Sequence, residues 1–417
     1  MSIPAPLVTD AKTKFSLTDP ADRASLVKLA EELLALRGLS IEDLRTEVRG
    51  AEAPLELKLA AKLVESRRNL LAVDEPVRLG VVFAMWGEQN RLLPQSKDNP
   101  NGEDSLCVKL DQLAWATRDT PVEWTLYAVD DGCPHGSAAL ARERAATHPL
   151  GDRVKVLELA SELPQSDGPL APLASAGDSQ KGGAVILGCL TAMEERADAV
   201  IYTDADGSVH LGQLGLLLPP FVERGTRMVL GDRKHEDAVL VKQESRWGIG
   251  IKVLRHLQRR IGEPIFSRGI RDTQSAFKLY AAPLLKEILR EPTVYDFSFD
   301  TDWILAGLAR EERFEKVPFA FIDSFEESAS ITQGPMTTWI ALLHGLAKQV
   351  RRHGLPHDED MARLLVEELP AAADLDLLIN HLPTELEDAG DADLGAPGVM
   401  SADALRAWVR ERKATTG

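Results

Sequence analysis

Cysteine is scarce in this sequence, and its few occurrences follow none of the patterns of disulfide or zinc proteins. The 417 residues include three cysteines, Cys107, Cys133 and Cys189, and no two of them form a Cys-x-x-Cys pair. Such wide spacing supports neither a disulfide framework nor a structural zinc site. We therefore expect the three thiols to be small packing residues.

Long apolar runs and a surplus of positive charge are also missing. No apolar run approaches the length of about 20 residues that a membrane-spanning helix needs. The N-terminal stretch MSIPAPLVTDAKTKFSLTD lacks the charged-then-apolar layout of a signal peptide. The formal net charge of -17 argues against a nucleic-acid partner and against electrostatic docking on an anionic membrane. These absences predict a cytoplasmic protein.

Short apolar runs that alternate with helix-like stretches fill the middle of the chain. The runs RLGVVFAM, VEWTLYAV, DRVKVLEL, AVIYTD and RMVLGD follow one another from Val77 onward. Strands that alternate with helices predict an α/β fold, in which a Rossmann-like, mostly parallel sheet carries helices on both faces. A hydrophobic content of 44% is ordinary for such a core.

The two ends of the chain have a different, helical pattern. Thr18-Asp19-Pro20 offers a helix cap and a first-turn proline, and Ser40 to Asp43 form a capping-box pattern. The C-terminal part becomes acidic and helix-prone. We therefore predict a helical N-terminal extension at residues 1–75, a central domain at 76–335 and a helical C-terminal region at 336–417. The two helical regions are candidates for a homodimer interface.

A pair of carboxylates ends the fourth apolar run. Asp204 and Asp206 follow Ala199-Val-Ile-Tyr-Thr203 directly, one residue apart. Because side chains alternate along a strand, both carboxylates should point the same way where the strand ends. Two oxygen ligands on one side suit Mg²⁺ or Mn²⁺, which commonly join one or two carboxylates to substrate phosphates. His210 is a candidate third ligand, although a hydrogen-bonding histidine is the favoured interpretation.

Polar groups follow the other predicted strands as well. In an open parallel sheet the ligand crevice lies at the carboxyl ends of the strands, so these groups should converge there. The set comprises an aromatic and acidic turn at Trp86 and Glu88, an acidic turn at Asp130 and Asp131, the glycine-rich helix start Lys181-Gly182, and Gly231-Asp232-Arg233. An aromatic face, acceptors and bare backbone suit a base, a ribose and phosphates.

The order of these motifs resembles the family 2 inverting glycosyltransferases of GT-A fold over roughly residues 77–335. Among the members of this family, the sequence resembles the dolichyl-phosphate glucosyltransferases and the dolichol-phosphate mannose synthases. YTDADGS is similar to their metal-binding segment, AVDDGCPHGS to their nucleoside pocket and QKGGAVILG to their glycine-rich turn. IRDTQSAFKLY, at residues 270–280, is similar to their Asp-Thr-Gln-x-Gly-Phe-Lys signature and is the most specific match.

The resemblance implies a role for individual residues. Glu88, Asp130 and Asp131 would contact the nucleoside, while Asp204 and Asp206 would hold the metal and the diphosphate. The further donor-binding residues that it implies are Arg233, Arg246, Arg271, Asp272 and Gln274. The sequence departs from the family at Ala84 and Gly87, where a proline and an asparagine are usual, and at Ala276, where a glycine is usual.

A carboxylate-rich helix start supplies the predicted base. Asp296-Phe-Ser-Phe-Asp300-Thr-Asp302-Trp303 leads into a helix-like run, and the resemblance places the family's acidic residue at Asp302 or Asp300. We favour Asp302. Either carboxylate can instead simply cap the helix.

The sequence thus predicts a metal-dependent inverting hexosyltransferase. The favoured donor is a UDP-hexose, with UDP-glucose first, and the favoured acceptor is a hydroxyl of a small molecule or glycan. The alternative acceptor is a polyprenyl phosphate, which needs no base. A sugar nucleotidyltransferase is less favoured because AMWGEQNRL, after the first strand, lacks that class's glycine-rich loop. A non-catalytic scaffold is disfavoured by the retained motifs.

Overall fold

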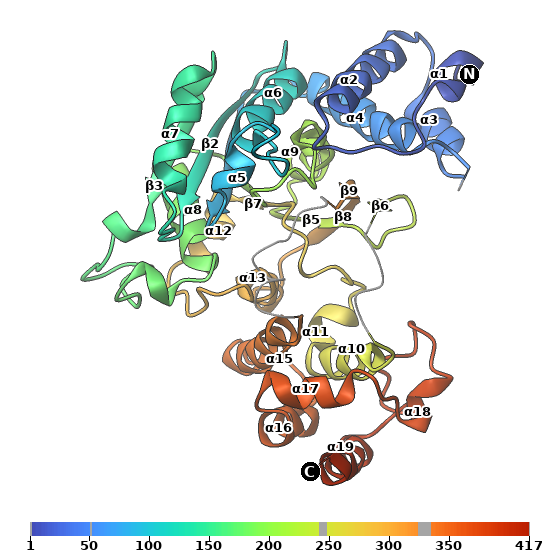
Figure 1. Ribbon diagram of the computed structural model, residues 1–417, viewed down its shortest axis with the longest axis vertical. Coiled ribbons are helices and arrows are strands. Elements are labelled where there is room, and N and C mark those ends of the chain that lie inside the picture. The colour runs from blue at the N-terminus through green and yellow to red at the C-terminus, as the bar shows by residue number, and fades with distance from the viewer. Residues whose placement is uncertain (1, 51, 242–247, 324–334, 417) are drawn as a thin grey trace. The chain divides into compact units, whose positions relative to one another are not determined.

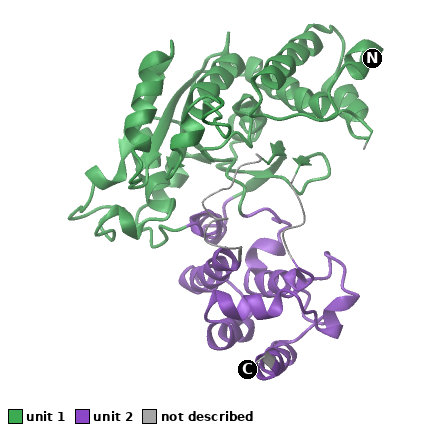
Figure 2. Ribbon diagram, viewed as in Figure 1, with its two compact units in different colours: residues 1–242, 274–296, 313–326 green, residues 243–273, 297–312, 327–417 purple. Residues whose placement is uncertain are grey.

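The computed structural model describes residues 2–50, 52–241, 248–323 and 335–416, which divide into two compact units (Figure 2). The first unit comprises residues 1–242, 274–296 and 313–326, and the second comprises residues 243–273, 297–312 and 327–417. Each unit combines segments that are far apart in the sequence. The linear division at residues 75 and 335 stays a prediction.

A seven-stranded sheet forms the centre of the first unit (Figure 1). Its strand order is β3-β2-β1-β4-β7-β5-β8, and β7 runs antiparallel to both of its neighbours. The remaining pairs are parallel, and a separate parallel pair joins β6 to β9. The strands are β1 Val77–Met85, β2 Val122–Asp130, β3 Val154–Glu158, β4 Ala199–Thr203, β5 Met228–Asp232, β6 Val239–Val241, β7 Lys278–Ala281, β8 Phe314–Pro318 and β9 Ala320–Ile322. The predicted α/β class is confirmed.

Helices cover both faces of the sheet because the strands are apolar on both sides. Val81 and Phe83 of β1 join the core that includes Leu110 of α6 (Ser105–Thr117). Val82, on the opposite side, faces α8 (Gly182–Glu194). A Cβ added at Gly188 of α8 would lie 2.5 Å from a methyl group of Val82, so the glycine permits this close approach. Helix α7 (Ser137–Thr147) packs beside β3.

The N-terminal helices form a second core within the first unit. Asp19 caps α2 (Pro20–Ala35) by accepting hydrogen bonds from two backbone amides, and Ser40 and Asp43 form the capping box of α3 (Ile41–Val48), as the sequence predicts. Together with α4 (Leu55–Leu71), these helices bury leucines against Ala320 and Ile322 of β9. The extension therefore packs on β9 and has a core of its own within the first unit.

The second unit is helical. Helices from three sequence segments pack together, and Trp303 of α13 (Phe299–Ala309) is almost fully buried there. Its members are α10 Ile251–Ile261, α11 Glu263–Phe266, α13, α15 Pro335–Arg352, α16 Glu359–Glu368, α17 Ala372–Leu378, α18 Thr384–Glu387 and α19 Ala402–Thr416. The predicted helical C-terminal region is confirmed.

Short elements complete the chain. They are α1 Ala5–Thr9, α5 Gln89–Leu92, α9 Leu218–Val222, α12 Ala282–Ile288, and the 3-10 helices η1 Gly151–Arg153, η2 Leu159–Ser161, η3 Ala176–Asp178 and η4 Leu211–Leu216. Within the described ranges, no helix combines the length and apolar character needed to cross a membrane.

Candidate nucleotide-sugar and metal site

Asp204 and Asp206 lie directly after β4, next to the carboxyl end of β1 in the sheet. Both residues are partly exposed, whereas Ala205 between them is buried. Asp206 accepts a hydrogen bond at Oδ1 from the backbone amide of Ser208, at 3.0 Å. The strand end thus presents two carboxylates on one short turn, as the alternation of side chains predicts.

Lys181 forms an ion pair with Asp204, its ammonium meeting Oδ1 of the carboxylate. Burial alone would raise the pKa of Asp204, but the Lys181 ammonium, with smaller contributions from the charges of Arg233 and Lys109, lowers that pKa. Burial and the charge of Asp204 together raise the pKa of Asp206. The charged form of Asp204 is therefore stabilised by a cation, whereas the charged form of Asp206 is destabilised by Asp204. A cation bound to both carboxylates would relieve the repulsion between them.

A tight turn positions Lys181 for this contact. Asp131, which is 6% exposed, accepts hydrogen bonds from the Ser179 hydroxyl and from the Lys181 backbone amide, both at 2.6 Å. Burial raises the pKa of Asp131 to about 6, against the effect of these donors. The next residue, Gly182, lies so close to the Tyr295 backbone that an added Cβ would be 2.6 Å from its carbonyl carbon. Asp131 therefore supports the turn, a role that the resemblance alone does not indicate.

The ends of β1 and β2 are fastened to each other. The backbone amide of Gly87 donates to Cys133 Sγ at 3.2 Å, and that of Glu88 donates to the Ser137 hydroxyl at 3.3 Å. Asp130 accepts from the backbone amide of Cys133 at 2.8 Å. Trp86 remains 49% exposed beside this turn. The predicted nucleoside-binding residues therefore share one edge of the sheet with the aspartate pair.

A buried charge cluster that sequence reasoning missed supports the aspartate turn. Glu103 accepts from the backbone amide of Gly207 at 2.7 Å, and Lys109 donates to the carbonyl of Asp206 at 2.6 Å. Arg91 lies between Glu88 and Glu103, at 2.7 and 3.3 Å. Burial and the charge of Asp206 raise the pKa of Glu103 to about 7. The signal was hidden because Arg91 and Glu103 fall in a polar segment with no motif of its own, and Lys109 lies in the largely apolar helix α6.

The donor set fits a hard divalent cation that also binds a diphosphate. Among the residues the structure describes, no group of three or more His, Cys, Asp or Glu side chains is placed to hold a metal ion. Asp204 and Asp206 would therefore supply two oxygens, and phosphate oxygens and water the remainder, as Mg²⁺ and Mn²⁺ sites commonly have. Partly exposed carboxylates with an unequal charge balance are consistent with such a site.

The remaining predicted donor-binding residues have varied surroundings. In the first unit, the guanidinium of Arg233 lies 4.9 Å from the ring centroid of Phe321, and Gln274 is partly buried. In the second unit, Arg271 is exposed and Asp272 is buried. Arg246 lies outside the described residues.

The predicted base lies in the second unit with a partner that the sequence did not reveal. Asp302 is 3% exposed, and its Oδ1 lies 2.8 Å from Nε2 of His353, just beyond α15. A nitrogen of Arg352 lies 3.6 Å from its Oδ2. The neighbouring Asp300 is buried as well. Fifty-one residues separate Asp302 from His353, so only folding brings them together.

His210 is a hydrogen-bonding core residue, as the favoured interpretation predicts. It is 1% exposed, and its Nδ1 accepts from the backbone amide of Gly212 at 3.0 Å. Burial, with a smaller contribution from the charge of Arg23, lowers the pKa of His210 to about 3.

This pKa predicts a pH-dependent stability. A histidine whose pKa is lower in the folded than in the unfolded state stabilises the fold above pH about 6.5. That stability is lost as the pH falls toward 3, the pKa in the fold. We expect the free energy of unfolding to fall between pH 6 and 4 more steeply than in His210→Asn, by about 1.4 kcal/mol per pH unit. Urea denaturation at several pH values measures both slopes, and equal slopes would contradict a buried neutral imidazole.

Known proteins that resemble the chain in sequence are hexosyltransferases, although no protein-family model matches it. Undecaprenyl-phosphate mannosyltransferase of Micrococcus luteus is 27% identical over 226 residues, which is 54% of this chain and 80% of that protein. Dolichyl-phosphate beta-glucosyltransferase of Drosophila melanogaster is 25% identical over 239 residues. That match covers 55% of this chain and 62% of the relative, so the chain spans about three fifths of that protein's length.

Solved structures resemble the fold more distantly. Glucosyl-3-phosphoglycerate synthase from Mycobacterium tuberculosis, in complex with Mn²⁺, UDP and glucosyl-3-phosphoglycerate, is 13% identical with a TM-score of 0.45, over 71% of this chain and 85% of that one. Mannosyl-3-phosphoglycerate synthase from Rubrobacter xylanophilus is 16% identical with a TM-score of 0.45, over 70% and 78%. At these TM-scores the likeness adds no argument about function. The sequence relatives confirm the predicted resemblance and the predicted class of enzyme.

Proposed function

We propose that this chain, a glycosyltransferase related in sequence to the polyprenyl-phosphate hexosyltransferases, transfers a hexose from a nucleoside-diphosphate sugar to a polyprenyl phosphate. The names of the relatives favour this acceptor, which the sequence alone ranked second, over a hydroxyl. In the reaction an acceptor oxygen bonds to the anomeric carbon while the bond from that carbon to the diphosphate breaks, with inversion. The nucleoside diphosphate leaves. A UDP-hexose donor and a cytoplasmic location are parts of this proposal.

The observation that carries the proposal is the aspartate pair with its lysine. Asp204 and Asp206 form one partly exposed turn at the carboxyl end of β4, and the ammonium of Lys181 contacts Asp204. Metal-dependent binding of a diphosphate needs carboxylates that hold the metal ion and positively charged side chains that contact the phosphates. A bound Mg²⁺ or Mn²⁺ would neutralise the charge that grows on the leaving diphosphate.

The surrounding residues have matching roles in the proposal. Trp86 offers its exposed face to the base, and Glu88 and Asp130 lie at the adjoining strand ends. The backbone amides at Gly182 and Gly183 begin α8, where a helix N-terminus favours an anion. Lys181 places an ammonium beside Asp204, close to where phosphate charge would be held. Arg233 adds positive charge near Asp204.

A hydroxyl acceptor is the second candidate, because of one observation. Asp302 is buried and contacts His353 at 2.8 Å, and a carboxylate held by an imidazole is suited to proton transfer. An alcohol must lose a proton as it attacks, whereas a lipid phosphate is already ionised. The two acceptors therefore make different demands on Asp302.

Asp302→Asn separates the two acceptors. With polyprenyl phosphate we expect turnover to change less than about tenfold, because no base is needed, whereas an alcohol acceptor would lose about 10²- to 10⁴-fold. Transfer of labelled glucose from UDP-glucose and of mannose from GDP-mannose is measured with undecaprenyl phosphate, dolichyl phosphate and simple alcohols in parallel. Asp300→Asn, measured alongside, tests the other carboxylate that the resemblance offers as the base. Wild-type protein that makes no glycolipid from any donor would contradict the proposed function.

A further inference from the structure

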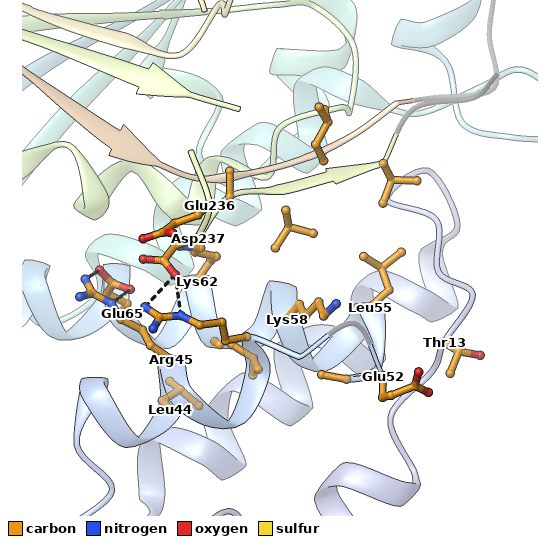
Figure 3. A pocket seen from close by; sticks show the side chains of 18 residues that line it. Thr13, Leu44, Arg45, Glu52, Leu55, Lys58, Lys62, Glu65, Glu236 and Asp237 are labelled. Carbon is orange, nitrogen blue, oxygen red and sulfur yellow. Dashed lines mark hydrogen bonds and ion pairs between the residues drawn. The ribbon is translucent and has the colours of Figure 1, made fainter. Parts of the chain in front are cut away.

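A cavity of about 640 Å³ lies in the first unit, and neither aspartate of the pair lines it. Figure 3 shows this cavity from close by. Its walls come from α3, from α4 and from the chain that enters β6 at residues 236–241. Its size is within the range of small-molecule sites, roughly 300 to 1,000 Å³. The helical N-terminal extension therefore contributes a concave surface of its own.

Two acidic side chains beside this cavity, those of Glu65 and Asp237, are already engaged, whereas Glu52 and Glu236, which also line it, are exposed. Arg45 contacts both carboxylate oxygens of Glu65, at 3.2 and 2.5 Å. Arg49 contacts Asp237 through two nitrogens, at 3.1 and 3.0 Å. Figure 3 shows Arg45, Glu65 and Asp237 along one side of the cavity. Each arginine thus forms an ion pair with a carboxylate that would otherwise be available to a nearby lysine.

Lys62 of α4 lines the cavity and has no such partner. Lys62 is 6% exposed, and its ammonium makes no hydrogen bond or ion pair with any residue the structure describes. The other two lysines that are buried in the described ranges differ, because Lys109 donates to two carbonyls and Lys278 donates to the carbonyl of Ser275. An ammonium buried without a partner is costly.

Electrostatics and apolar walls together define a complementary ligand. Burial lowers the pKa of Lys62, and Arg45 acts in the same direction, while the charges of Glu65 and Asp237 offset only part of this decrease. A single anionic group would compensate both effects. The cavity also presents Leu44, Leu55 and Val239 to its interior, so part of the ligand should be apolar.

We propose that this cavity is a second binding site, which takes a small amphiphilic anion whose carboxylate or phosphate pairs with Lys62 and whose apolar part lies against α3, α4 and β6. The site is independent of the proposed transferase reaction. A bound ligand would contact both the N-terminal extension and strand β6. Binding would therefore stabilise the extension against unfolding.

Calorimetric titration with defined probes tests the site. Octyl phosphate and octanoate supply the two anionic groups on the same chain, and octanol supplies the chain alone. We expect at least one of the anions to bind the wild type at least tenfold more tightly than octanol, and the stronger one identifies the head group. Octanol binding as tightly as both anions would overturn the role of Lys62, and no binding of either anion at millimolar concentration would overturn the site.

Three variants complete the test. Lys62→Met should weaken binding of the anion at least tenfold and raise the thermal unfolding midpoint of the free protein, since it removes an unpaired buried charge. Lys28→Met, on α2 with a side chain 78% exposed, is the matched control and should change neither. Val48→Trp should block the cavity while Lys62 remains. UDP binding with Mn²⁺ serves as a folding control in all variants, and anion binding unchanged in Lys62→Met would refute the proposal.

Discussion

Asp206→Asn is expected to lower turnover by about 10²- to 10³-fold, as removal of one preorganised electrostatic group commonly does in active sites. The substitution keeps the size of the side chain and an oxygen that can still accept from the Ser208 amide. It removes the negative charge that a divalent cation would bind. Steady-state kinetics measures the loss of turnover, and calorimetry with UDP and Mn²⁺ measures the loss of metal-dependent nucleotide binding.

The two aspartates should differ in their effect on stability. Asp206→Asn relieves the repulsion that raises the pKa of Asp206, so we expect the metal-free variant to unfold at a higher temperature than wild type. Asp204→Asn takes the carboxylate away from Lys181 and should unfold at a lower temperature. Such a division, in which activity falls and stability rises at Asp206, is typical of a functional site.

Asp111→Asn is the control for both aspartates. Asp111 lies on α6 in the same unit, and its side chain is 74% exposed. We expect its kinetics to stay within threefold of wild type. An Asp206→Asn enzyme that matched this control in turnover and in metal-dependent UDP binding would contradict the proposed metal site.

Gly182→Ala is expected to destabilise the fold and impair donor binding together. Alanine in place of a helical glycine ordinarily stabilises by about 1 kcal/mol. At Gly182, however, the added Cβ would lie 2.6 Å from the carbonyl carbon of Tyr295. We therefore expect a loss of about 1–3 kcal/mol, as in other overpacked sites.

The functional loss should follow from a displaced turn. The carbonyl of Tyr295 accepts from the backbone amides of Gln180 and Gly183, at 2.9 and 3.3 Å, so moving it disturbs both sides of Lys181. Lys181 itself has φ of 77°, a conformation that its neighbours must hold. A misplacement of about 1 Å can cost about 10²-fold in rate. We expect a loss of this order in kcat/KM.

Gly177→Ala provides the matched control in the same loop. A Cβ there would meet the Ser175 hydroxyl at 3.4 Å, which is ordinary contact. Urea denaturation and donor kinetics should therefore leave Gly177→Ala near wild type. A Gly182→Ala protein with wild-type stability and kinetics would show that the contact with Tyr295 does not fix the turn.

Much of the fold could be predicted because its signals are local. The five apolar runs became β1 to β5, and the caps at Asp19 and Ser40 formed as their residue types indicate. Strand β7 was missed, although it overlaps residues 270–280, the segment that resembles the family signature. It is four residues long and includes the buried Lys278, so it shows no periodicity. Its position between β4 and β5 depends on pairing with distant strands.

The candidate site likewise combines residues that the sequence could predict with residues that it could not. Asp204 and Asp206 could be found because one strand end carries both, and their spacing in the chain fixes their spacing in space. Glu103 and Lys109 could not, because each reaches the aspartate turn across about 100 residues of sequence.

By itself the sequence determined the α/β class, the strand ends that carry the chemistry and the relationship to hexosyltransferases. The physical reason is that side-chain alternation, helix capping and short motifs act between residues close in the chain. Only the tertiary structure decided that Asp131 supports the turn of Lys181, that Asp302 contacts His353, and that Lys62 is buried beside a cavity. Those contacts depend on which distant segments pack together and are buried from water. Local sequence patterns do not specify which segments pack together.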